Sequence, residues 1–335
     1  MISSLRITDL GPIASAEYTF DPRLTLLTGD SFSGKTFVLN ALFFGLTGSF
    51  PCDRIPLLTA GVLPIQPEGG VEAVVRTEFG TADGNISIER TFGGRLCVAE
   101  PLHQEAASLV ILARADGSVL IADPCGENGD DLNPRLGFRF LTFEELVDGK
   151  LVGTSCSPHG LVNEFVLWSM LRPDLFRASE DLVRDLFPAD CPTVFGGILD
   201  GTRESVRRLP TVRRRITGHD GRQIETEVPM TVLPLGRQRW LALAYAIVLC
   251  ADRHRRAAAR FGIDPLPRLT LLIDEPEAHC SARDAAGILP ALRTALDRFE
   301  TYPEIQVVAA SSSESVLAGL EKSGVPFGRI DMKPL

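Results

Sequence analysis

Apolar and polar residues alternate differently along the chain, and the pattern predicts which parts form strands and helices. A short apolar run at residues 24–27 is typical of a buried strand in a parallel sheet. Residues 37–44 carry apolar side chains at helical spacing. Residues 231–320 alternate between helical patterns and apolar runs, which indicates an α/β core. The most apolar stretch, residues 241–250, is too short to span a membrane, and we interpret it as a buried helix.

The middle of the chain has a different pattern. Short strand-like runs lie between residues 71 and 123, and the Asp-Gly pairs at 83–84 and 116–117 suit tight hairpin turns. Helical patterns follow, including one at residues 161–171, and the sequence His-Asp-Gly at 219–221 suits a further hairpin. We therefore expect an antiparallel region followed by a helical one.

Residues 29–36 read GDSFSGKT and match the phosphate-binding pattern G-x-x-x-x-G-K followed by Ser or Thr. The two glycines allow the backbone to curl, so that its N–H groups point at phosphate oxygens. Lys35 adds a positive charge at the β- and γ-phosphates, and Thr36 is expected to ligate Mg²⁺. The following helix presents its positive N-terminal end to the same phosphates. The sequence thus predicts that ATP is held by Gly29, Asp30, Ser31, Phe32, Ser33, Gly34, Lys35 and Thr36.

A second motif, LTLLIDEPEAH at residues 269–279, is an apolar strand that ends in two adjacent carboxylates. Hydrolysis of ATP needs one carboxylate on the metal and one on the attacking water. We assign the first role, Mg²⁺ binding, to Asp274 and the second, that of general base, to Glu275. Together with Lys35, Glu275 is the predicted catalytic residue. In a chain without the upstream phosphate-binding loop, the same residues would indicate only a solvated acidic turn.

These segments, SLRITDLGPI…LTLLTGDSFSGKT and LLIDEPEAH, resemble the ABC-type, AAA-family ATPase heads of the RecF/SMC/OLD group. The resemblance covers residues 1–50 and 230–320. It implies an α/β P-loop fold and a homodimer in which a third motif of each protomer caps the ATP of the other. It also implies one domain made of a core with a mixed sheet at 1–60 and 236–335, an antiparallel lobe at 61–125 and a helical lobe at 140–235.

The third motif of that group, L-S-x-G followed by Gln or Glu, has an altered counterpart in VLPLGRQRWLALAYA at residues 232–246. Gly236 is retained and is expected to face the triphosphate of a second protomer. Pro234 stands where the family has the serine that contacts the γ-phosphate. Arg237 replaces Gln or Glu, and two interpretations of it stay open: an arginine that supplies charge to the other protomer, or a surface residue of an amphipathic helix.

Another departure lies in QVVAASSSESVL at residues 306–317, where Ser312 takes the place of the family's switch histidine. A serine can hydrogen-bond a phosphate or water but brings no positive charge. Two functions from different classes follow. In the first, the protein is an ATPase whose dimerisation and hydrolysis gate a partner effector encoded elsewhere, in bacterial defence or DNA repair. In the second, it is a binding module that ATP switches with negligible hydrolysis.

The formal net charge of −9 at pH 7 argues against a general polyanion binder. One basic cluster is a candidate contact for nucleic acid, or alternatively a solvated face or a site for an acidic partner. Its members are Arg203, Arg207, Arg208, Arg213, Arg214, Arg215 and Arg222.

The seven cysteines show no short-spaced pairs of the kind that zinc sites use, so reduced thiols are expected. No secretory signal precedes residue 20. We therefore expect a cytoplasmic protein without a membrane segment. The chain has no heptad run for a coiled coil, and the part that follows Ser312 is too short for the nuclease domain of OLD-type proteins.

Overall fold

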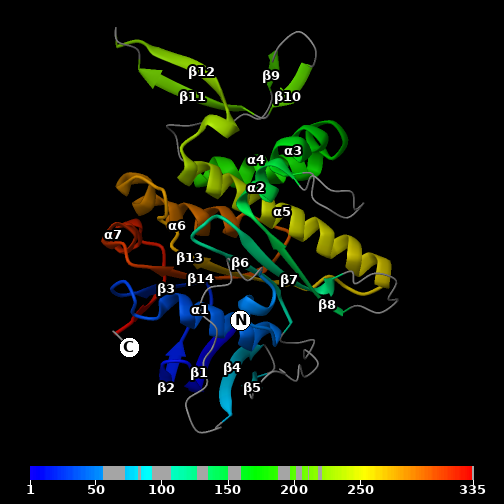
Figure 1. The fold of residues 1–335 in the computed structure, drawn as a ribbon. Coiled ribbons are helices and arrows are strands. Elements are labelled where there is room, and N and C mark those ends of the chain that lie inside the picture. Colours follow the sequence, from blue (N-terminus) through cyan, green and yellow to red (C-terminus); the bar gives the residue numbers. More distant parts are fainter. Residues whose placement is uncertain are drawn as a thin grey trace.

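The computed structural model describes residues 1–55, 72–81, 84–92, 107–126, 135–149, 160–187, 197–200, 206–209, 211–217 and 221–333. Its centre is a seven-stranded sheet in the order β15-β3-β14-β13-β6-β7-β8 (Figure 1). Neighbours from β15 to β6 run parallel, and β7 and β8 complete the sheet in antiparallel pairing. The strands are β3 (Leu24–Thr28), β6 (Leu109–Ala113), β7 (Val119–Gly126), β8 (Arg135–Leu141), β13 (Arg268–Asp274), β14 (Glu304–Ser311) and β15 (Gly328–Asp331).

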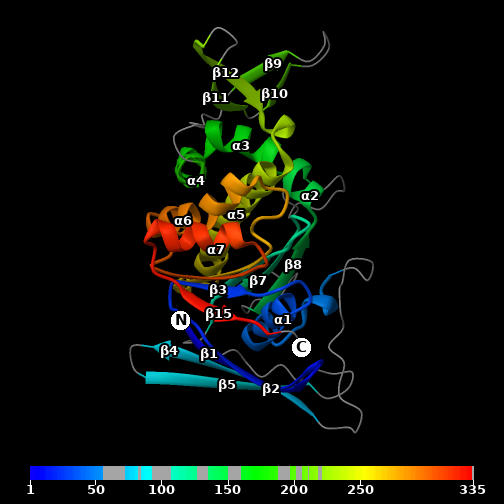
Figure 2. The same cartoon turned by 90° about the vertical axis from the view of Figure 1, so that its left-hand side faces the viewer.

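A four-stranded antiparallel sheet in the order β2-β1-β4-β5 forms a second layer (Figure 2). Helix α1 (Lys35–Thr47) lies between the two sheets, followed by a short 3-10 turn, η1 (Pro51–Asp53). Apolar side chains of both sheets and of α1 form one buried cluster, which includes Leu5, Phe43 and Leu272. The strands of this second sheet are β1 (Ile2–Leu10), β2 (Ile13–Thr19), β4 (Ala73–Thr81) and β5 (Gly84–Phe92).

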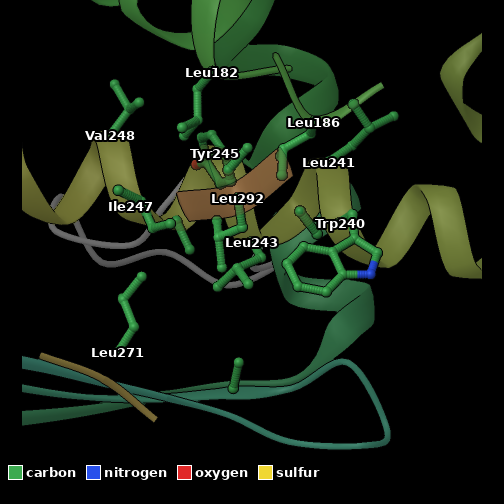
Figure 3. Close-up of a cluster of buried hydrophobic side chains, with 14 of the residues drawn as sticks. Leu182, Leu186, Trp240, Leu241, Leu243, Tyr245, Ile247, Val248, Leu271 and Leu292 are labelled. Carbon is green, nitrogen blue, oxygen red and sulfur yellow. The ribbon is translucent and has the colours of Figure 1, made fainter. Parts of the chain in front are cut away.

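Helices cover the opposite face of the central sheet. Helix α5 (Leu235–Phe261) buries the whole apolar run 241–250, which confirms the buried helix predicted from the sequence. Figure 3 shows Tyr245 and Leu243 of this helix among side chains of the neighbouring elements. The helices of this layer are α2 (Phe143–Asp148), α3 (Gly160–Leu171), α4 (Pro173–Leu186), α5, α6 (Ala282–Asp297) and α7 (Glu314–Ser323).

The central strands are apolar on both sides because both faces of the sheet are covered. In β14, Val307 points into the core on the α5 side, whereas Val308 points into the core on the α1 side. The same alternation holds in β13 for Leu271 and Leu272. This double burial is why these strands appear in the sequence as continuous apolar runs rather than as alternating ones.

Strands β6 and β7 differ from the expectation that residues 61–125 form an antiparallel lobe. The predicted hairpin turn at 116–117 is present, since Ala113 pairs with Val119. However, the hairpin belongs to the central sheet, where β6 runs parallel to β13. All five residues of β6 are buried, and a strand with so little polar surface is stable only between two covering layers.

Two hairpins, β9–β10 and β11–β12, lie at the end of the molecule remote from β1 and β2 (Figure 1). They are formed by β9 (Gly197–Asp200), β10 (Val206–Leu209), β11 (Thr211–Thr217) and β12 (Gln223–Pro229), and the turn η3 (Met230–Val232) leads from them to α5. Most of the arginine cluster lies on β10 and β11, while Arg203 is outside the described residues. In the register of this hairpin, Arg213 is paired with Glu227 and Arg215 with Glu225.

Within the described part of the chain, no helix combines the length and the apolar character needed to cross a bilayer.

Candidate active site

The phosphate-binding loop follows β3 directly and ends in the first turn of α1. Three of its residues, Gly29, Phe32 and Gly34, have positive φ angles, so the chain curls as the motif predicts. A side chain at Gly29 is excluded, because a β-carbon there would lie 2.6 Å from the carbonyl oxygen of Met332. No side chain caps the N-terminus of α1, and its first turn contains no acidic residue. The free N–H groups of that turn are therefore available to an anion.

Lys35 extends back into this loop. Its Nζ donates hydrogen bonds to the carbonyl oxygens of Gly29 (2.8 Å) and Asp30 (2.7 Å) and to Oγ of Ser33 (3.3 Å). The side chain is almost fully buried, and no carboxylate among the described residues pairs with it. A buried ammonium group that is hydrogen-bonded only to uncharged oxygens of the loop is a strong attraction for phosphate oxygens.

Thr36 meets Asp274 from a position 238 residues away in the sequence, at the carboxyl end of β13. Its Oγ1 lies 3.0 Å from Oδ1 and 3.1 Å from Oδ2 of Asp274. Burial raises the pKa of Asp274 to about 6, the Thr36 hydrogen bond opposes this, and the neighbouring charge of Glu275 adds to the increase. The ionised form of Asp274 is thus destabilised in this environment, and a nearby cation would stabilise it.

This donor set fits Mg²⁺. The hydroxyl oxygen of Thr36 and the carboxylate oxygens of Asp274 converge on one point beside Lys35, and all are hard oxygen donors. Magnesium sites of nucleotide enzymes use one or two protein oxygens, and substrate phosphates and water complete the shell. These two residues would hold the ion, which would neutralise phosphate charge.

Glu275 follows Asp274 with an exposed side chain and a left-handed backbone, φ 48°. Such a conformation costs a non-glycine residue about 1–2 kcal/mol, so its surroundings must hold it. Its N–H donates to the carbonyl oxygen of Ala310 on β14 (2.9 Å). The result is a carboxylate that points out of the sheet edge from a fixed backbone, as a general base requires.

Arg239 also holds the backbone of Asp274 and Glu275 in place, and its role was not predicted from the sequence. The buried guanidinium donates to three backbone carbonyls, those of Arg114 (2.8 Å), Asp274 (2.7 Å) and Glu275 (2.6 Å). Burial lowers the pKa of Arg239, but hydrogen bonds use its donors in place of water. Its only sequence signal is a charged residue at the edge of the apolar run 241–250.

Glu277 is a second residue that the sequence analysis did not single out. Its Oε1 accepts hydrogen bonds from Oγ of Ser311 (2.8 Å) and from the N–H of Ser312 (3.3 Å). This contact fixes the end of β14, so that the exposed side chain of Ser312 lies beside the acidic end of β13. Ser312 is therefore near the candidate site, although whether it contacts phosphate stays a prediction.

Residues 232–237 lead from η3 into the first residues of helix α5, beside the loop that follows β13. Gly236 is buried against its own chain, because a β-carbon there would lie 2.5 Å from the carbonyl oxygen of His279. The expectation that Gly236 faces a second protomer's triphosphate stays a prediction. The guanidinium of Arg237 packs inward, 3.4 Å from Asp284 and 5.5 Å from the ring centre of Phe187, which favours a structural role over a charge offered to a partner.

Comparison with known proteins finds similar solved structures but no matching family. No family model and no curated protein matches the chain. The SMC head domain from Thermotoga maritima is 14% identical with a TM-score of 0.45, over 95% of this chain and 91% of that one. The SMC head bound to the C-winged helix domain of ScpA is 14% identical with a TM-score of 0.49, over the same shares. RecF with ATPrS, from the RecFOR pathway, is 9% identical with a TM-score of 0.41, over 94% and 93%. These proteins belong to the groups that the sequence motifs resemble.

Proposed function

We propose that this chain binds MgATP at residues 29–36 and hydrolyses it, with Glu275 as the general base. The observation that supports this most is the contact between Thr36 and Asp274. It brings the helix that follows the phosphate-binding loop and the acidic end of β13 to one point, beside the buried charge of Lys35. Phosphoryl transfer needs this arrangement of cation, metal-holding carboxylate and base.

Each group has a separate task in this mechanism. The N–H groups of the loop and Lys35 bind the β- and γ-phosphates and stabilise the charge that develops on them. The carboxylate of Glu275 accepts a proton from the attacking water. Arg239 touches no reacting atom, but it holds the backbone from which the Asp274 and Glu275 side chains project. It is a positioning residue.

Removal of magnesium tests the hydrolysis directly. We expect phosphate release from ATP in Mg²⁺ and no measurable release in excess EDTA, because Thr36 and Asp274 lose the ion that neutralises the phosphates. If the protein binds MgATP but releases no phosphate, the second function applies, a switch with negligible hydrolysis. Pro234 and Ser312, which replace two phosphate-contacting family residues, are the observation that favours this alternative.

Dimerisation around ATP is part of the proposal. Large apolar side chains are exposed at both surfaces that a head-to-tail dimer would cover: Phe32 of the loop at 99%, and Val232 and Leu235 before and at the start of α5 at 65% and 45%. Burial of such side chains stabilises an interface. Since Gly236 and Arg237 pack within the chain, we assign the contact across the dimer to these exposed neighbours.

The variant Leu235→Glu should prevent ATP-dependent dimerisation while ATP still binds. Leu235 is the first residue of α5, where an acidic residue is compatible with the helix dipole, so the monomer should fold. The introduced charge would lie against the partner's triphosphate and should weaken the dimer by about tenfold or more. Light scattering with and without ATP measures this. Leu171→Glu, at another exposed leucine, on α3, is the matched control. Equal dimerisation of the Leu235 variant and wild type would contradict the interface.

A partner effector completes the proposal, with a role in bacterial defence or DNA repair. Its support is the sequence resemblance described above, together with a second exposed apolar group at Leu167, Met170 and Leu171 on α3. Such a partner should co-purify with the ATP-bound protein and not with the nucleotide-free one. Equal co-purification with the ATP-bound and the nucleotide-free protein would argue against gating of the effector by ATP.

A further inference from the structure

A cavity of about 380 Å³ lies between strands β7 and β8 and the C-terminal half of helix α5. It is separate from the candidate active site. Arg239 contacts that site from the N-terminal part of α5, whereas Arg253 and Arg260 line the cavity from the C-terminal part of the same helix. At 1.5 Å per residue, the two regions are about 20–30 Å apart along the helix axis.

Small residues form part of the cavity wall: Gly126 on β7, Gly137 on β8 and Ala257 on α5. A β-carbon at Gly126 would lie 2.4 Å from the α-carbon of Gly137, so the two strands are in close backbone contact there. Apolar side chains, including those of Ile121, Leu141 and Leu249, form part of the wall. The volume lies in the range of small-molecule sites, about 300–1,000 Å³.

Four arginines line this space: Arg139, Arg253, Arg256 and Arg260. The three on α5 recur at helical spacing along one side of the helix, where Arg253 is half-buried and Arg256 and Arg260 are exposed. Arg139 lies between Gly137 and Leu141 in the alternation of β8 and therefore projects toward α5. Its Nη1 is buried and has no hydrogen-bond partner. A buried donor without a partner costs free energy, which a bound anion would recover.

Asp123, an acidic residue of the cavity lining, does not neutralise these arginines. Its Oδ1 accepts hydrogen bonds from Nδ1 of His254 (2.7 Å) and from the N–H of Cys125 (2.9 Å). Arg256 is paired with Asp252, which also pairs with Arg172. Among the described residues that line the cavity, four are arginines and one is an aspartate, although the whole chain carries a net charge of −9.

The same residues do not form a metal site, although Asp123, Cys125 and His254 bring their ligand atoms within 4.8 Å of one another. The N–H of Leu266 donates to Nε2 of His254 (3.0 Å), so Nε2 must be the unprotonated nitrogen. Nδ1 therefore carries the ring proton and donates it to Asp123 (2.7 Å), so both ring nitrogens of His254 are already engaged in hydrogen bonds.

We infer that this cavity binds a compact organic phosphate of about the size of a nucleoside monophosphate. Guanidinium groups bind phosphate oxygens in forked pairs, and they do so best where the arginine donors are already turned inward. The apolar wall would receive the ring or hydrocarbon part of the ligand. Because α5 runs from this cavity to Arg239, the ligand would bind on the helix that also supports Asp274 and Glu275.

Calorimetry on the full chain tests this site, with the Lys35→Ala variant used to remove the phosphate-binding loop's contribution. The probes are the four ribonucleoside 5′-monophosphates, inorganic phosphate and a 5′-phosphorylated single-stranded oligonucleotide. We expect at least one monophosphate to bind, and Arg139→Gln and Arg253→Gln each to weaken that binding by about tenfold or more. Arg255→Gln should change it by less than about twofold, because Arg255 is exposed on α5 and does not line the cavity; a twofold change is well below the effect of a lost charged hydrogen bond.

Three results would overturn the inference. The first is the absence of binding by any probe at millimolar concentration. The second is binding that both cavity variants leave unchanged, or that Arg255→Gln weakens as much as they do. The third is binding only of a 5′-phosphorylated single-stranded oligonucleotide, which would assign the arginines to nucleic acid. If Arg139→Gln fails to fold, the half-buried Arg253 still decides the outcome. Loss of ATP turnover in wild type would bear on the active site and not on this cavity.

Discussion

Replacing Lys35 with alanine should abolish measurable ATP binding. The ammonium group is nearly buried inside the loop and donates only to uncharged acceptors of that loop, so its charge is available to the β- and γ-phosphates. Truncation of one partner of a buried, hydrogen-bonded charge pair costs several kcal/mol, and we expect the affinity for MgATP to fall by more than about 100-fold. Isothermal titration calorimetry measures it.

The control for this variant separates lost binding from lost folding. Lys322→Ala removes the same charge from an exposed position near the end of α7 and should leave ATP affinity unchanged. Thermal unfolding of the Lys35 variant should show a cooperative transition, because Val38 and Phe43 keep α1 packed between the two sheets. A folded Lys35→Ala protein with the affinity of wild type would remove the phosphate-binding assignment, and the proposed function would fail with it.

The parts of the site that the sequence predicted are those in which neighbouring residues set the geometry. The loop at 29–36 curls because of its own glycines, and Glu275 follows Asp274 at the end of an apolar strand. The meeting of Thr36 with Asp274 could be expected as well, because carboxyl ends of parallel strands share one edge of a sheet.

The parts that the sequence did not predict depend on contacts between distant segments. Arg239 matters because strands β6 and β13 end at the same place and present three carbonyl oxygens to it. No spacing along the chain shows this. The close approach of Gly236 to the backbone of His279 is likewise a contact between segments that are distant in the sequence, and the motif around Gly236 does not predict it.

The division of the strands between the two sheets also depends on contacts between distant segments. The turn at 116–117 was predictable from Asp-Gly, because a tight hairpin needs only local conformational freedom. Whether the hairpin joins the central sheet or the antiparallel one is decided by which edge it meets, and Ile111 of β6 pairs with Leu271 of β13. The continuous apolar run LVILA at residues 109–113, all of it buried in the structure, is the sequence signal that could have indicated the central sheet.

Glu275→Gln should separate ATP binding from ATP hydrolysis. Glutamine keeps the shape of the side chain but cannot accept a proton from water, and loss of a general base lowers turnover by about 10²-fold or more. The backbone should stay in place, because Arg239 and the carbonyl of Ala310 hold it through main-chain atoms that the substitution does not change. ATP affinity should therefore remain that of wild type.

The same variant should accumulate as an ATP-bound dimer, because ATP hydrolysis, the step that would let the two protomers separate, is blocked. Phosphate release gives the turnover, and size-exclusion chromatography with light scattering gives the assembly state with and without ATP. Glu300→Gln, at an exposed glutamate after α6, is the matched control and should behave as wild type in both measurements. Glu277 is not an equivalent base, since Ser311 and Ser312 both donate to its Oε1. If Glu275→Gln hydrolyses ATP as fast as wild type, the base lies elsewhere. If turnover falls but no dimer forms in ATP, Glu275 keeps its catalytic role, and the head-to-tail assembly through Phe32 and Leu235 has to be abandoned.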